Sequence, residues 1–311
     1  MNQIVEPCES IINTTPEFPM GWFSVAKSRD LQVGEVTRVF AFDRELALYR
    51  TRNGVAVIQD AFCPHLGAHL GVNGKVVGES LQCPFHGWRF DAKGDCVEIP
   101  YCDAIPDRAK LRIWDSVEKN GEIYMWFHPQ NTAPQFELPD FPELEDPNWT
   151  SPRYHEIKIP ASMQDIAENT CDPVHFRYVH RQPDTPPSEV TVDEDGRTLH
   201  LRADVDVGGG VISKLHSKVF QMGLAFVRNV YGPNAEMVVY NSAQPIDRET
   251  TLLRWTLTVR REIEDLAGDN VMTGIIEGIQ QDMPIWENKV HKRKPIFCRE
   301  DQDLVLFRKW A

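Results

Sequence analysis

No apolar run in this 311-residue sequence approaches the roughly 20 residues that a membrane-spanning helix needs. The first residues, Met1–Glu6, lack the basic and then apolar order of a secretory signal peptide. Positive charge is also scarce, because 33 Lys and Arg face 46 Asp and Glu, for a formal net charge of −13. This acidity argues against nucleic acid and anionic membranes as partners. We therefore expect a cytoplasmic protein without a transmembrane segment.

Cysteine is sparse as well, and its seven residues show no spacing typical of a disulfide framework. Two of the seven stand in short segments that also contain histidine. Cys63-Pro64-His65 is followed, after seventeen residues, by Cys83-Pro84-Phe85-His86. Each segment thus supplies one thiolate and one imidazole.

This spacing favours a [2Fe–2S] cluster of the Rieske type, in which two cysteines bind one iron and two histidines bind the other. The predicted ligands are Cys63, His65, Cys83 and His86. A Cys₂His₂ zinc site is the alternative, since zinc uses the same ligand types. Zinc sites, however, usually group the two cysteines and then the two histidines, so the cluster is the better interpretation.

The pattern of strands and turns divides the chain into two domains. Residues 35–40, 55–58 and 121–127 are rich in β-forming side chains, with glycine and asparagine turns between them. The prolines of residues 130–152 exclude a continuous helix and predict an extended connector. We therefore expect an all-β domain over residues 1–138 and a second domain over residues 139–311.

The second domain combines strands with two helical segments. Strands are predicted at 198–202, 237–240 and 252–259, and an interrupted helix at 162–180. A further helix is predicted from residue 269 to about 292. Its apolar face is expected to carry Ile275, Ile279, Trp286 and Val290.

The interrupted helix contains His175 and His180, which lie about 140° apart on a regular helix and converge only if it bends. Pro173 suits the first position of a new helical turn, with Asp172 as its N-cap. Asp172 and His175 share a face, so the carboxylate is placed to hydrogen-bond the imidazole of a metal-bound histidine.

Asp282 falls on the apolar face of the later helix, three residues after Ile279 and four before Trp286. A buried carboxylate there is costly unless it is paired or binds metal. Two histidines and one carboxylate form the facial triad of non-haem Fe(II) oxygenases. Alternatively, Asp282 pairs with Lys289 or Arg293, or Pro284 turns it outward. The presence of a cluster in the same chain favours the metal site.

With these motifs the chain resembles the terminal oxygenase component of Rieske non-haem iron oxygenases. The likeness rests on Cys63-x-His65, Cys83-x-x-His86, Asp172-x-x-His175-x₄-His180 and the late Asp282. It extends to the 3-ketosteroid 9α-hydroxylase oxygenases and cholesterol 7-desaturases. Three stretches carry that closer likeness: Ile99-Pro100-Tyr101, residues 168–180 and residues 281–289.

The resemblance implies an α+β fold, with an N-terminal all-β Rieske domain and a C-terminal helix-grip catalytic domain containing a large antiparallel sheet. It implies a head-to-tail homotrimer, in which Asp172 links His175 to His65 or His86 of a neighbouring subunit. It also implies that Asn169 offers a hydrogen bond near the iron. The expected cofactors are the [2Fe–2S] cluster and mononuclear Fe(II), with dioxygen as co-substrate.

The resemblance further implies a monooxygenase that hydroxylates or desaturates an apolar, steroid-like substrate. Its electrons would come from NAD(P)H through a separate reductase or a ferredoxin and reductase pair. Alternative substrates are aromatic, amine or other natural-product molecules, and a remote alternative is an electron carrier without oxygenase activity. Candidate pocket residues cluster around residues 219–240, namely Phe220, Met222, Leu224, Phe226 and Val227.

Overall fold

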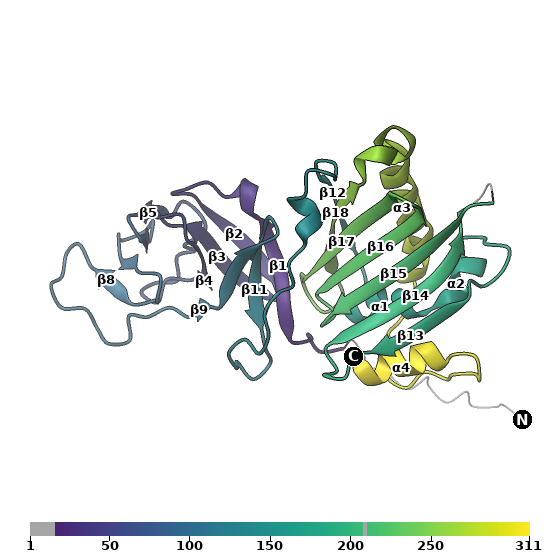
Figure 1. The fold of residues 1–311 in the computed structure, drawn as a ribbon. Helices are drawn as coiled ribbons and strands as arrows, with labels where there is room; N and C mark the ends of the chain where they lie inside the picture. The colour runs from purple at the N-terminus through teal and green to yellow at the C-terminus, as the bar shows by residue number, and fades with distance from the viewer. Residues whose placement is uncertain (1–15, 208–209) are drawn as a thin grey trace, which may run out of the picture.

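Two lobes, each built from antiparallel strands, make up the chain (Figure 1). The structure is a computed structural model that describes residues 16–207 and 210–311, with only the backbone for residues 265–272. The first six residues, on which the signal-peptide argument rests, lie outside this range. The N-terminal lobe is coloured purple to blue in Figure 1, and the C-terminal lobe runs from teal through green to yellow at the C-terminus.

The N-terminal lobe contains three sheets with the strand orders β1-β11-β10, β2-β3-β4-β9 and β5-β6-β7-β8. The strands expected near residues 35–40 and 55–58 form as β2 and β4, and β11 is buried along its whole length. The elements are β1 Gly21–Lys27, η1 Ser28–Asp30, β2 Val36–Ala41, β3 Arg44–Arg50, β4 Ala56–Asp60, β5 Lys75–Val77, β6 Ser80–Gln82, β7 Arg89–Phe90, β8 Cys96–Glu98, β9 Ile113–Trp114, β10 Ser116–Lys119 and β11 Glu122–Phe127.

The C-terminal lobe is a seven-stranded antiparallel sheet in the order β12-β18-β17-β16-β15-β14-β13. The long helix α3 packs on β12 and β18, which confirms the predicted α+β helix-grip arrangement (Figure 1). The elements are β12 Arg153–Ile159, α1 Met163–Ala167, η3 Glu168–Cys171, α2 Pro173–Tyr178, β13 Ser188–Val192, β14 Thr198–Asp206, β15 Ile212–Phe220, β16 Leu224–Gly232, β17 Ala235–Pro245, β18 Thr251–Val259, η4 Arg261–Ile263, α3 Glu264–Trp286 and α4 Gln302–Trp310.

The connector between the lobes is extended, as its prolines predict, apart from the short 3₁₀ turn η2 (Pro142–Leu144). Its first residues, 129–135, are exposed, whereas the stretch from Leu138 to Trp149 lies against one face of the large sheet. Leu138, Phe141 and Trp149 are buried there beside Val238 and Tyr240 of β17. The connector therefore covers the side of the sheet that α3 leaves open.

One of the hydrophobic clusters among the described residues runs through both lobes. It includes Phe23 and Ile58 from the first lobe together with Val239 and Trp255 from the second. Polar contacts reinforce the junction, since the guanidinium of Arg254 donates to the main-chain oxygen of Ser24 at 3.1 Å. The interface between the lobes is thus packed like a domain interior, which fixes one lobe against the other.

Helix α3 ends earlier than predicted. Its last helical residue is Trp286, whereas the prediction extended the helix to about residue 292. Val290 therefore lies outside the helix and is 54% exposed, so its assignment to the apolar face is wrong. Pro284 lies in the last turn, where its missing N–H and bulky ring favour termination.

Candidate metal centres and substrate cavity

Two loops of matching conformation, one preceding β5 and one joining β6 to β7, carry the predicted cluster ligands. The N–H of Gly67 donates to the carbonyl of Cys63 at 2.9 Å, and that of Gly87 donates to the carbonyl of Cys83 at 3.1 Å. Both glycines have positive φ, 74° and 75°, which side chains with a Cβ rarely adopt. The glycine after each motif therefore closes the turn that presents its ligands.

The two thiols and the two imidazoles form separate pairs. Cys63 and Cys83 are both 3% exposed, and the rings of His65 and His86 lie 4.7 Å apart between centroids. Burial, with the neighbouring Cys83, raises the pKa of the Cys63 thiol to about 12, so a thiolate there needs the positive charge of a metal. The Nδ1 atom of His65 is buried without any hydrogen-bond partner.

These observations fit a two-iron cluster better than a single zinc ion. A single zinc ion would draw its ligand atoms close together. Among the described residues, the groups of three or more potential ligands whose atoms all lie within 4.8 Å of one another include none of these four residues. The four ligands therefore surround more space than one tetrahedral ion fills. The orphaned Nδ1 of His65 is the kind of atom that a metal would satisfy.

The chain bends between α1 and α2, and this bend presents both histidines. α2 begins at Pro173, and the Asp172 carboxylate accepts hydrogen bonds from the main-chain N–H groups of Val174 (3.1 Å) and His175 (3.2 Å). The predicted N-cap is confirmed. The predicted bond from this carboxylate to the His175 imidazole is wrong, because the main-chain carbonyl of Asp172 contacts Nδ1 instead. Both cap bonds use Oδ1 of the carboxylate.

His175, His180 and Asp282 converge although α3 begins more than 80 residues after His180. Their ligand atoms lie within 4.8 Å of one another, and Nε2 of His180 is 3.6 Å from Oδ2 of Asp282. The side chain of Gln281 contacts Nδ1 of His180 at 3.0 Å. Each histidine thus has Nδ1 engaged away from the centre, which leaves Nε2 available for a metal.

Asp282 is buried on the inner side of α3, at 7% exposure. Burial raises the pKa of its carboxyl, while the nearby His180 and His175 oppose that shift. Neither alternative for this residue holds. Pro284 does not turn it outward, and within the described residues Asp282 pairs with His180 rather than with Lys289 or Arg293, while Lys289 pairs with Asp165 at 3.1 Å. Two imidazoles and one buried carboxylate fit the donor set of a mononuclear Fe(II).

Behind the bend lies a partly buried charged network that sequence reasoning missed. Asp165 and Glu168, on α1 and η3, contact Lys289 at 3.1 and 3.8 Å. His291 lies 3.2 Å from Asp165, and the guanidinium of Arg308 on α4 contacts Glu168. These partners are more than 100 residues apart in sequence, so no local pattern indicates the pairing. The network anchors the bend to the segment after α3 and to α4.

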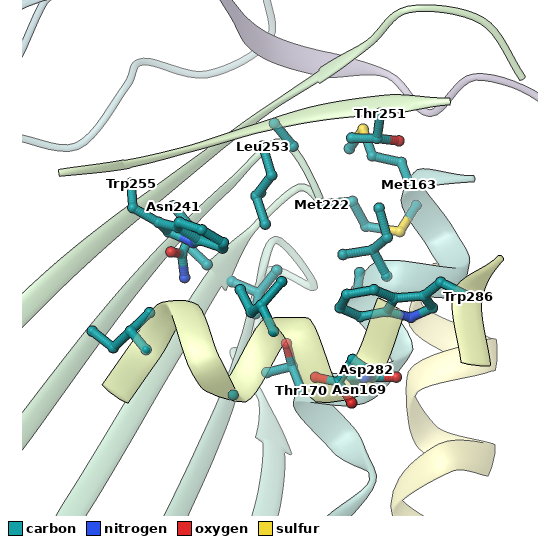
Figure 2. A pocket seen from close by; sticks show the side chains of 18 of the residues that line it. Met163, Asn169, Thr170, Met222, Asn241, Thr251, Leu253, Trp255, Asp282 and Trp286 are labelled. Carbon is teal, nitrogen blue, oxygen red and sulfur yellow. The ribbon is translucent and has the colours of Figure 1, made fainter. Parts of the chain in front are cut away.

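A cavity of about 370 Å³ lies between α3 and the sheet (Figure 2). His175, His180 and Asp282 line it, as does Asn169 of η3. Its walls are otherwise mainly apolar and include Met163, Met222, Leu253, Trp255, Ile279 and Trp286. Such a concave apolar site with few polar groups is typical of small-molecule pockets.

The predicted pocket segment is only partly right. Met222 and Leu224 line the cavity, although Leu224, the first residue of β16, also packs in the cluster beside the connector. Phe220 and Phe226 instead pack beside the connector, and Val227 packs against the core shared by the lobes. Alternate residues of a strand face opposite sides of the sheet, so a run of apolar residues cannot all line one pocket.

The fold and the two centres together define the class of the protein. Residues 21–114 match the family model described as Rieske [2Fe-2S] domain. The chain is a Rieske oxygenase, with a [2Fe–2S] cluster and a mononuclear iron as cofactors and dioxygen as co-substrate. Residues 125–311 match the 3-ketosteroid 9alpha-hydroxylase C-terminal domain, and the chain belongs to that family. The electron-carrier alternative is thereby excluded.

Relatives of known activity agree with this assignment. The chain is 30% identical to a Rhodococcus rhodochrous 3-ketosteroid-9-alpha-monooxygenase, oxygenase component, over 94% of this chain and 81% of that protein. It is 29% identical to the Caenorhabditis elegans cholesterol 7-desaturase, over 95% and 76% respectively. The resemblance inferred from the motifs is confirmed.

Solved structures show the same fold at lower identity. Pseudomonas putida CBB5 NdmA QL mutant with theobromine has a TM-score of 0.78 at 22% identity, covering 93% of this chain and 88% of that chain. Dicamba monooxygenase bound to dicamba has a TM-score of 0.73 at 22% identity, covering 94% and 96%. Among the described residues, no helix is long and apolar enough to cross a bilayer.

Proposed function

We propose that the chain is a terminal oxygenase that hydroxylates or desaturates a rigid, apolar, steroid-like molecule. The observation that carries this proposal is a mainly apolar cavity that contains His175, His180 and Asp282 in its wall. A substrate filling that cavity would displace water from the metal centre and be held next to it. The steroid hydroxylase and desaturase relatives support this substrate class.

In this proposal Cys63, Cys83, His65 and His86 hold the cluster, and His175, His180 and Asp282 hold the iron. When bound, the cluster carries single electrons and the iron supplies the oxygen chemistry. The protein contributes the geometry: the Asp172 cap fixes the start of α2, and the contact of Gln281 orients His180. Asn169 brings an amide to the cavity wall beside these residues.

The proposal includes a separate NAD(P)H-dependent reductase, or a ferredoxin and reductase pair, and a head-to-tail homotrimer. The cluster loops expose Leu66 (64%) and Phe85 (61%), while α2 exposes Tyr178 (74%) close to the iron ligands. Exposed apolar side chains at both centres suit a contact between subunits. Across it, the Asp172 carboxylate would meet His65 or His86 of the neighbouring subunit.

The test is dioxygen consumption by the holoprotein across a panel of steroids, aromatic compounds and betaines. Chemical reduction of the cluster, followed by a single turnover in air, removes the need to know the reductase. We expect steroids to accelerate oxygen uptake and to gain one oxygen or lose two hydrogens by mass spectrometry. Acceleration by aromatic compounds or betaines, with steroids inert, would refute the proposed substrate class.

A further inference from the structure

Asn241 is a polar residue on the cavity side of β17, where its neighbours on the same face are apolar. Met237, Val239 and Ala243 belong to the core shared by the lobes. Asn241 is paired in register with Trp255 of β18, and both line the cavity. Figure 2 shows these two side chains together at one side of the cavity, away from Asp282 and Trp286.

The amide of Asn241 has an unmet hydrogen-bonding requirement. Its Oδ1 atom is buried and has no hydrogen-bond partner. Leaving a buried carbonyl oxygen without a donor destabilises the folded protein, because the oxygen has lost its bonds to water and gained none in return. An apolar side chain at this strand position would avoid that cost, so the amide is poorly explained as a core residue.

Another polar group of the cavity differs in this respect. The hydroxyl of Thr251, on β18, donates to the main-chain oxygen of Ala161 at 3.0 Å. That hydroxyl is therefore satisfied by the protein itself. The Oδ1 atom of Asn241 has no such partner among the described residues, so the amide can form hydrogen bonds with a molecule inside the cavity.

We infer that Asn241 determines substrate specificity by binding an alcohol group of the substrate, at the side of the cavity away from Asp282. This inference rests on the proposed function and narrows its substrate class to apolar ring systems that bear a hydroxyl. An alcohol donates to Oδ1 and also accepts from Nδ2 of the amide. A ketone only accepts, so it leaves Oδ1 buried and unpaired.

The experiment compares two steroids that differ only at carbon 3, 5α-androstan-3β-ol and 5α-androstan-3-one. Their dissociation constants are measured by equilibrium dialysis against the wild-type holoprotein and the Asn241→Leu variant, which keeps the branched shape with four heavy side-chain atoms. We expect the wild type to bind the alcohol about fivefold more tightly than the ketone. In Asn241→Leu this preference should disappear.

Thr251→Val serves as the matched control, because it also removes a polar group from the cavity wall. It should keep the wild-type preference for the alcohol. The cluster absorption spectrum and the iron content show whether each variant is folded and loaded. If Asn241→Leu proves not to be folded and loaded, Asn241→Thr is measured in its place. Asn241→Thr keeps a smaller acceptor and should retain part of the preference for the alcohol.

The possible outcomes separate the inference from the proposed function. An alcohol preference that is equal in wild type and Asn241→Leu overturns the role of Asn241 while leaving the steroid oxygenase in place. A wild-type preference for the ketone does the same. If neither steroid binds the wild-type holoprotein and neither stimulates oxygen uptake, the proposed substrate class fails and the inference falls with it.

Discussion

At the scale of single residues, chemistry follows from the environment each side chain is given. Asp282 is an ordinary carboxylate by composition, but α3 buries it opposite His180 and His175. Asp172 shows the reverse case, because the carboxylate expected to orient an imidazole is used to cap α2. A sequence motif thus identifies which residues gather, and geometry decides what each one does.

The Asp282→Ala variant tests the assignment of the iron ligands. We expect this variant to lose its mononuclear iron, because one of three ligands is removed. Its rate of substrate-dependent oxygen uptake should fall at least about a hundredfold. The Rieske absorption spectrum should be unchanged, since the cluster loops are in the other lobe. Glu277→Ala, an exposed carboxylate on the same helix, is the control and should behave as wild type. Full iron content in Asp282→Ala would remove this residue from the ligand set.

At the scale of secondary-structure elements, local signals located the start of α2 but not the distant residues that hold it in place. Pro173 after a capping residue correctly predicts where α2 begins, and the prolines of the connector exclude a long helix. The charged network that holds the bend could not be predicted. Asp165 and Glu168 find Lys289 and Arg308 only because the chain returns to the bend after α3.

The hairpin of β14 and β15 carries a histidine that should make stability depend on pH. Burial lowers the pKa of His216 to about 4, and Arg202 and Lys218 add to this shift. His216 also contacts His200, which in turn contacts Asp193. The unfolded chain binds a proton near the ordinary value of 6.5 while the folded chain does not. Acid therefore favours unfolding, and stability should fall as pH drops from 6.5 towards 4.

Replacing His216 by glutamine should flatten that dependence. Between pH 6.5 and 4, the free energy of unfolding of wild type should fall by about 1–2 kcal/mol more than that of His216→Gln. The estimate is smaller than the full pKa difference implies, because solvent screens a half-buried ring. Urea unfolding at a series of pH values measures the two slopes. Above pH 7.5 the slopes should coincide, and equal slopes throughout would contradict the prediction.

At the scale of the whole molecule, the two lobes share one of their hydrophobic clusters. Core residues of both, such as Phe23 and Trp255, belong to the same cluster, so the predicted boundary at residues 138 and 139 divides the sequence without dividing the core. That boundary remains a prediction about domains. Lobes packed in this way would keep the distance between the cluster and the iron of one chain constant. In the proposed trimer, the cluster of one subunit would instead lie close to the iron of its neighbour.

The trimer leads to a prediction about mass and electron delivery. Sedimentation should give three times the chain mass of 35.6 kDa for wild type, and a smaller mass for Phe85→Glu, which puts charge into the proposed contact.

Asp172→Asn keeps an N-cap oxygen and should remain trimeric. It should nevertheless slow reoxidation of the reduced cluster in the presence of substrate by tenfold or more. Wild-type reoxidation in Asp172→Asn would restrict this residue to its capping role.

The sequence by itself determined the class of protein, the cofactors and the residues that the structure brings together as candidate ligands. Cys63, His65, Cys83 and His86 lie within short segments, and His175 and His180 lie five residues apart, so spacing alone indicates their chemistry. Only the tertiary structure decided which strand residues line the cavity and that Asn241 stands in it without a partner for Oδ1. The physical reason is that pocket walls and buried ion pairs depend on contacts between residues far apart in sequence, which no local pattern encodes.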